Sequence, residues 1–202
     1  MSSPVAERSP WEAALGDRFA LLHPRLSEYF SRVPDGFVGR GHGVFDHVGT
    51  PRRWLWPVLA ILARQGVLFA VWERSVPFTV INRPRGAWVD AVRIFRFRSG
   101  MRVMVDSITS VRGLVIDALG FGGAIRAALV PDVVDGALVL RSTAVGIRIG
   151  RLRVRLPGPT VRLTEQFDDT VSRQRVRLEL RVPLIGRIYE YSGTFQYEVV
   201  PE

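Results

Sequence analysis

The sequence predicts a mainly β protein, an antiparallel meander of about ten strands curled into a barrel or half-barrel, with two helical segments towards the N-terminus. From residue 76 onward, apolar and polar residues alternate in stretches that recur roughly every 10–14 residues between turns rich in glycine, proline and aspartate. Helical periodicity is confined to two stretches before that point. A sheet of about ten strands twists too strongly to stay open, which favours closure.

Composition bounds the function classes. The 202 residues are expected to form a single domain, residues 1–202, and the hydrophobic fraction of 47% is too high for a disordered chain. The absence of cysteine excludes disulfides, thiolate metal sites and a cysteine nucleophile. All 28 basic residues are arginine, a bias that weakens the net charge of +9 as a sign of a polyanionic partner.

The predicted helical cover comprises residues 10–32 and 51–66. An apolar stripe with spacings of three and four residues predicts the first, and Pro24 should break it into two short helices. Thr50 as N-cap followed by Pro51 predicts the start of the second. Residues 67–72 could extend that helix or form a buried connection, and the sequence leaves this open.

The predicted antiparallel sheet comprises residues 37–45 and 76–199. Residues 37–45 carry three glycines on one face, which predicts either sharp curvature or close approach by another element. Two later strands have clear sidedness: Leu152, Val154 and Leu156 are predicted to face inward, as are the apolar positions of residues 173–182.

Residues 51–100 hold most of the excess positive charge and also the most apolar stretch, residues 54–72. This pairing favours an interfacial surface over a nucleic-acid groove, so nucleic acid is an unlikely partner. Pro57 and Arg64 interrupt the apolar stretch, which is too short to span a bilayer. The opening MSSPVAERSPWE lacks the pattern of a signal peptide, and a cytoplasmic location is expected.

Several short motifs occur in sequence over roughly residues 14–197: Phe19, Leu22-His23-Pro24, Gly39-Arg40-Gly41, Val76-Pro77-Phe78-Thr79-Val80, Glu165 before Asp168-Asp169, Pro183-Leu184-Ile185-Gly186 and Tyr191-Ser192-Gly193. This set resembles the bacterial domain-of-unknown-function family number forty-one sixty-six. The resemblance implies no reaction. Some members of that family follow a saccharopine-dehydrogenase-like dinucleotide-binding domain, but this sequence has no GxGxxG motif and no cofactor is expected.

Glu165 is the first candidate catalytic residue. Alternation places it on one face with Val161, Leu163 and Phe167. A carboxyl among apolar neighbours should have a raised pKa and could act as a general acid or base. The alternatives are a buried ion pair with an inward arginine, or a carboxylate at the mouth of the barrel.

His42 is the second candidate catalytic residue, and Arg40 and Asp46 share its face of the strand. If that face points inward, the three could bind or protonate a polar group of a ligand. The alternative is a polar outer face. Because His42 and His47 fall on opposite faces, no metal site is expected.

Asp106 and Asp117 lie in apolar strand-like runs, where either could face a cavity or pair with a strand arginine. Aromatic residues decorate two predicted strands, and an aromatic-lined interior suits a large apolar ligand, although an ordinary core would look similar. The candidate ligand-binding residues are Arg40, Asp106, Trp88, Phe95, Tyr189, Tyr191 and Tyr197.

These observations predict a barrel that binds a hydrophobic small molecule. Its catalytic version would be a cofactor-independent cyclase or isomerase acting on a polyketide- or isoprenoid-like intermediate, since holding a flexible chain in a reactive shape needs little acid–base machinery. The alternative is a non-enzymatic module that docks on a membrane surface or a partner oxidoreductase through residues 51–74. The oligomeric state stays open.

Overall fold

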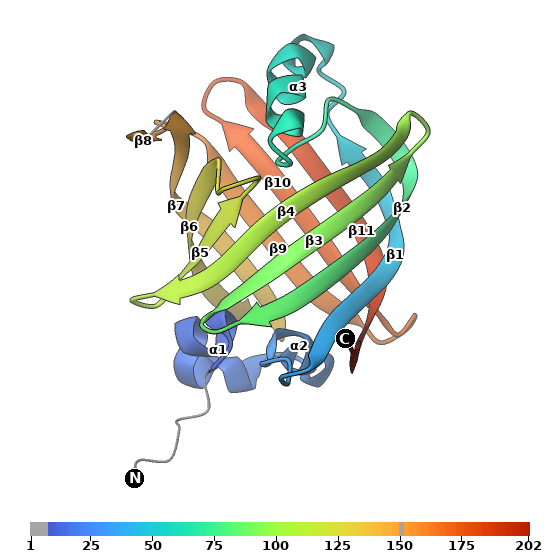
Figure 1. The fold of residues 1–202 in the computed structure, drawn as a ribbon, viewed down its shortest axis with the longest axis vertical. Coiled ribbons are helices and arrows are strands. Elements are labelled where there is room, and N and C mark those ends of the chain that lie inside the picture. Colours follow the sequence, from blue (N-terminus) through green and yellow to red (C-terminus); the bar gives the residue numbers. More distant parts are fainter. Residues whose placement is uncertain (1–7, 150–151) are drawn as a thin grey trace.

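Ten antiparallel strands close into a barrel, and an eleventh strand pairs outside it (Figure 1). This computed structural model describes residues 8–149 and 152–202. Neighbouring strands follow chain order from β1 to β7, continue through β9, β10 and β11, and return to β1, which confirms the predicted meander. The strands are β1 (Phe37–Gly49), β2 (Trp72–Arg85), β3 (Trp88–Phe97), β4 (Gly100–Val111), β5 (Leu114–Leu119), β6 (Ile125–Val134), β7 (Ala137–Ile149), β8 (Leu152–Arg155), β9 (Thr160–Asp168), β10 (Arg173–Val182) and β11 (Gly186–Pro201).

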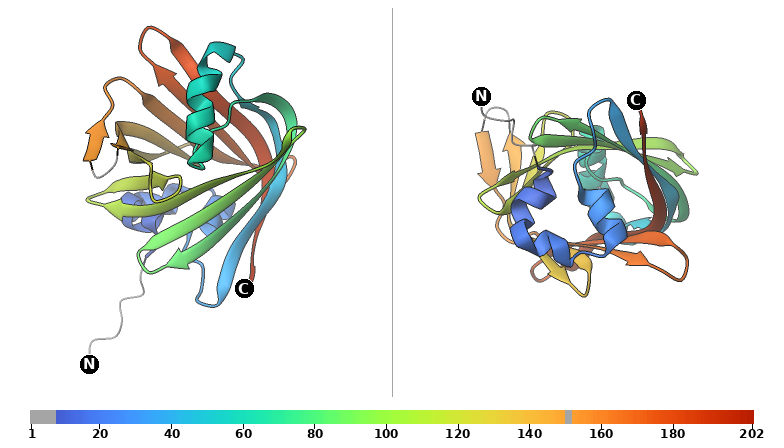
Figure 2. Two further views of the ribbon diagram at one scale, coloured as in Figure 1. Left: turned by 45° about the horizontal axis from the view of Figure 1, so that its top comes forward. Right: turned by 90° about the horizontal axis from the view of Figure 1, so that it is seen from below.

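The N-terminal helical segments lie across one end of the barrel (Figure 2). They are α1 (Pro10–Leu15), a 3-10 helix η1 (Gly16–Leu21) and α2 (Pro24–Phe30). A capping box formed by Ser9 and Glu12 starts α1, and the Ser9 hydroxyl also donates to the carbonyl oxygen of Phe30 over 2.5 Å. The start of α1 is thereby tied to the end of α2. As predicted, the helical region is divided where Pro24 begins a new helix.

The second helical region lies at the opposite end of the barrel, as η2 (Arg53–Leu55) and α3 (Trp56–Arg64) (Figure 1). Gly66 follows with a φ of 70°, a left-handed conformation that suits glycine after a helix end. Residues 67–69 then form a buried connection. Phe69 contacts the rings of Phe95 and Phe97 with centroid distances of 5.2 and 5.4 Å. The connection therefore fills part of the barrel and does not extend the helix.

The glycines of β1 face the barrel interior and let other side chains approach the strand. A Cβ atom on Gly43 would lie 2.6 Å from the Cα of Phe195, and one on Gly41 would lie 2.7 Å from Cγ1 of Val80. Close approach by neighbouring elements is thus the reason for glycine on this face.

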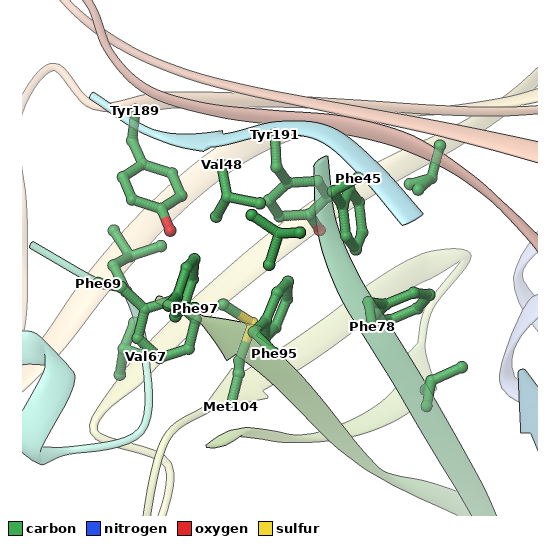
Figure 3. Close-up of a cluster of buried hydrophobic side chains, with 14 of the residues drawn as sticks. Phe45, Val48, Val67, Phe69, Phe78, Phe95, Phe97, Met104, Tyr189 and Tyr191 are labelled. Atoms are coloured by element: carbon green, nitrogen blue, oxygen red, sulfur yellow. The ribbon is translucent and has the colours of Figure 1, made fainter. Parts of the chain in front are cut away.

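An aromatic cluster fills one side of the barrel interior (Figure 3). It joins β1 to β4 with β11 and with the buried connection at residues 67–69. Its labelled members are Phe45, Val48, Val67, Phe69, Phe78, Phe95, Phe97, Met104, Tyr189 and Tyr191. Rings from different strands pack edge-to-face, with centroids 4.6 Å apart for Phe45 and Phe78. Large aromatic side chains packed in this way supply much of the buried apolar area of the barrel.

The predicted sidedness holds for β10 and for Leu156, which follows β8 and faces the barrel interior, and it is wrong for Leu152 and Val154 of β8. On β10, Val176 is buried and Leu178 lies with it on the inner face of the barrel. On β8, in contrast, Leu152 is 72% exposed and Val154 is 43% exposed. Within the described chain β8 pairs with β7 alone, outside the closed barrel, so no second layer covers its apolar side chains. None of the described helices has the length and apolar composition of a segment that crosses a bilayer.

Candidate functional site

A cavity of about 230 Å³ lies inside the barrel, beside the aromatic cluster. Its walls come mainly from β4 to β7, β9 and β10, and apolar side chains make up most of them. Members of this apolar lining include Ile108, Val115, Leu119, Ile125, Ala127, Leu129, Leu140, Val145, Val161, Leu163, Leu178 and Leu180. An apolar cavity with a few polar groups is the usual form of a small-molecule site. We call it the interior cavity.

Among the described residues, five polar side chains reach the interior cavity from different elements. Strand alternation places Arg93 of β3, Asp117 of β5 and Glu165 of β9 on inner faces, and Asn82 of β2 and Tyr29 of α2 join them. These groups are far apart in sequence and meet only because the meander closes.

Arg93 is the central cation of this group. Its guanidinium forms an ion pair with Asp106, which lies two strand positions from Ile108 on the inner face of β4. The Asp106 side chain is 1% exposed. Burial of this charge is tolerable only because the guanidinium neutralises it. Of the two alternatives for Asp106, pairing with a strand arginine is the one observed.

Glu165 is 8% exposed and lines the interior cavity. Burial raises the pKa of its carboxyl to about 7, against the opposing effects of a hydrogen bond from Gln174 and of the charge on Arg93. Gln174 donates to Oε2 of this carboxyl from the neighbouring strand β10. The raised pKa agrees with the sequence analysis, and an inward arginine is present as well.

Asp117 is a second acid at the interior cavity. Burial raises its pKa to about 6, although the charge on Arg93 acts to lower it. Its Oδ1 atom is buried and has no hydrogen-bond partner among the described residues. Burial also raises the pKa of Tyr191 to about 12, so this phenol stays neutral at physiological pH.

Several predicted ligand-binding residues belong to the aromatic cluster instead of the cavity wall. Phe95, Tyr189 and Tyr191 are buried there. Tyr197 packs against Tyr29, with ring centroids 4.5 Å apart. These four face inward as expected, but they fill the barrel beside the cavity.

Trp88, Arg40 and His42 lie on the outer surface, away from the interior cavity. Trp88 is half-buried, with the guanidinium of Arg85 5.7 Å from the centre of its ring. Arg40 and His42 are exposed because the glycines take the inner face of β1. His42 borders a larger hollow of about 610 Å³ beside α2, whose lining mixes polar and apolar side chains. The structure therefore does not bring His42 together with Glu165.

Arg93, Asn82 and Tyr29 are the polar cavity residues that the sequence analysis missed, and Arg93 is the one that a local pattern could have revealed. Alternation in β3 places it on the face of Ala91, Phe95 and Phe97, and all three are buried. The alternation alone would have placed Arg93 on the inner face, but an arginine in a strand is normally assigned to the solvent-exposed face. In the part of the chain that the structure describes, no three histidine, aspartate or glutamate residues are grouped so as to hold a metal ion.

The arrangement is compatible with binding of an apolar molecule and places two proton-exchanging groups beside it. Carboxyls whose pKa lies near neutrality are effective general acids and bases. Glu165 and Asp117 meet that condition, and the cavity would exclude water from a bound molecule.

Comparison with protein families supports the resemblance seen in the sequence. The model of the family described as Domain of unknown function (DUF4166) matches residues 22–195. The match runs from the end of η1 to Phe195 in β11 and so includes all or part of every strand that surrounds the interior cavity. A search of the curated proteins found no match to this chain.

Proposed function

Because this chain belongs to the DUF4166 family, for which no reaction is implied, we propose its function from the interior cavity: the barrel binds an apolar small molecule. The observation that carries the proposal is an apolar cavity of about 230 Å³ with a few convergent polar groups, in a barrel whose other side is tightly packed. Sites for drug-sized ligands typically measure about 300–1,000 Å³. The cavity thus fits a smaller molecule, such as a short chain or a compact ring system.

A larger polyketide- or isoprenoid-like molecule would need additional room. The buried connection at residues 67–69 is the segment to displace, because Val67 and Leu68 form part of the cavity wall. No hydrogen-bonded strand or helix includes these residues. Movement there would enlarge the cavity without opening the barrel.

The catalytic form of this proposal is a cofactor-independent cyclase or isomerase. Its barrier would be lowered mainly by holding a flexible molecule in one reactive shape. Glu165 would supply or accept the proton, because His42 lies on the outer face. Glu165→Gln should then abolish turnover while binding persists, and unchanged turnover would remove Glu165 from the mechanism.

Native mass spectrometry with organic extraction tests the binding proposal directly. We expect a discrete adduct lighter than a drug-sized ligand, because the cavity is smaller than the sites that hold ligands of that size. Ala127→Leu narrows the cavity and should remove the adduct, whereas Ala118→Leu on the outer face of β5 should keep it. An apo mass for the unmodified protein, together with no binding of added apolar compounds, would overturn the proposal.

A second candidate function is docking on an anionic membrane surface, and one observation favours it. Trp54, Val58 and Ile61 are 60%, 58% and 61% exposed, at spacings that place them on one face of η2 and α3. Arg52, Arg53 and Arg64 flank this face, and residues 51–72 contain no acidic residue. We call these exposed residues the α3 face.

The composition of the α3 face matches that of an interfacial helix, in which apolar side chains enter the lipid boundary and arginines meet anionic head groups. Sedimentation with vesicles of phosphatidylglycerol and phosphatidylcholine tests this at low salt. Ile61→Ser should reduce binding, whereas Val171→Ser, an exposed valine of the β9–β10 turn near α2, should not. Absence of sedimentation with these vesicles would exclude the membrane function and leave a protein partner as the alternative for residues 51–74.

A further inference from the structure

Resting on the proposed function, we infer that the molecule held in the interior cavity carries a hydrogen-bond-donating head group without negative charge, an alcohol or an amine, which meets Asp117 and Glu165. The inference depends on the charges, the unused acceptors and the position of these two acids.

The charged side chains that line the cavity include more acidic than basic groups. In the described part of the chain, the charged side chains that line it are Arg93, Asp117 and Glu165. The guanidinium of Arg93 is already paired with Asp106 of the neighbouring strand β4. Among the described residues, a carboxylate or phosphate head group would therefore find no unpaired cation at the cavity and would face two acids, which disfavours an anion.

Within the described chain, one acceptor atom at the cavity also lacks a donor. Oδ1 of Asp117 is buried with no hydrogen-bond partner among the described residues. The hydrogen bond from Gln174 to Glu165 uses Oε2. Buried acceptors without donors are rare, because each costs about 1–3 kcal/mol of desolvation without compensation. A donor on the ligand would remove that cost.

The two acids come from different walls of the cavity. Asp117 lies on β5 and Glu165 on β9, with β6 and β7 between them in the barrel wall. The apolar side chains of β6 and β7, including Ala127, Leu129 and Leu140, line the same cavity. The apolar body of the ligand would lie against β6 and β7, and its donor group would approach the acids on the strands at either side.

A matched set of eight-carbon compounds tests the inference. Octylamine, octanol, octanoate and octane are titrated against the protein at pH 8, in competition with the neutral fluorophore N-phenyl-1-naphthylamine. We expect octanol or octylamine to displace the fluorophore at concentrations at least about tenfold lower than octanoate. Equal or tighter binding of octanoate would overturn the inference while leaving the binding function standing. Failure of the fluorophore and of all four compounds to bind would instead overturn the proposed function.

Variants show whether the two acids cause the preference. The fluorophore should still bind to the double variant Asp117→Asn, Glu165→Gln. In this variant, the preference for octanol or octylamine over octanoate should fall to less than about threefold. Glu179→Gln, on the outer face of β10, is the matched control and should keep the full preference. An unchanged preference in the double variant would refute a role for these acids.

Discussion

Replacing Glu165 by glutamine should change the pH dependence of stability in a direction set by burial. Burial raises the pKa of this carboxyl from an ordinary value of 4.5 to about 7. Below about pH 4.5 the group is protonated in both the folded and the unfolded state. As the pH rises from about 4.5 to 7, the unfolded chain releases a proton that the folded chain retains, so the free energy of unfolding falls, and it levels off above pH 7, where the folded chain releases its proton as well.

The size of this effect follows from the two pKa values. Each pKa unit corresponds to about 1.4 kcal/mol, so the full loss for Glu165 is about 3 kcal/mol between strongly acidic and alkaline solution. Most of it occurs between pH 5 and pH 9. Glutamine keeps the volume and the hydrogen-bonding capacity towards Gln174 but does not ionise. The stability of Glu165→Gln relative to the unmodified protein should rise by about 2–3 kcal/mol over that interval.

Urea unfolding at pH 5, 7 and 9 measures this difference. Glu179→Gln is the control: partial burial acts to raise the pKa of Glu179, but hydrogen bonds from Arg177 and Arg181 lower it below its ordinary value, so the group is ionised over most of the interval. Its stability relative to the unmodified protein should change little with pH. A flat profile for Glu165→Gln as well would show that Glu165 is solvated or permanently paired, and would refute the reasoning.

Three further changes probe the packing of the barrel. Gly43→Val would force a Cβ towards the Cα of Phe195 and should lower the free energy of unfolding, measured in urea, by about 1–3 kcal/mol. An unchanged free energy would mean that β1 and β11 are not closely packed at this point. Arg93→Met leaves Asp106 buried and unpaired and should lower the free energy of unfolding by about 3–5 kcal/mol. The double variant Arg93→Met, Asp106→Leu should recover most of this loss. If it recovers none, the ion pair is not the cause of the loss. Phe69→Ala should lower the free energy of unfolding by about 3–5 kcal/mol. Native mass spectrometry should then show binding of larger apolar ligands. An unchanged ligand size would mean that Phe69 does not limit the size of the cavity.

Much of the fold was predictable because strand periodicity and turn residues are local signals. The alternation in residues 173–182 correctly assigned its inner face, and Pro24 correctly divided the first helical region. The same alternation failed for Leu152 and Val154. A period of two shows that a strand has one apolar face, but whether another layer covers that face depends on where the sheet closes.

The candidate site was predictable only in part, because it is assembled from distant strands. Glu165 stood out as a lone acid among apolar neighbours, and the structure places it in the cavity wall. His42 shared a strand with three glycines, and nothing in that strand alone tells which face is inward. Arg93 has its partner Asp106 on the next strand, and such pairing depends on a register that the sequence does not display.

The contact between β1 and β11 is the feature on which folding kinetics should depend. Phe37 lies opposite Pro201 there, whereas most other strand pairs are hairpins between chain neighbours. Hairpins form in microseconds, but a pairing between segments so distant in sequence pays the largest loop-closure entropy and is slow. Until it forms, Asp117 and Glu165 remain in contact with water and titrate as ordinary acids. Refolding should therefore include a late step in which β1 pairs with β11 and the barrel closes. In this step the two carboxyls lose contact with water and take up protons.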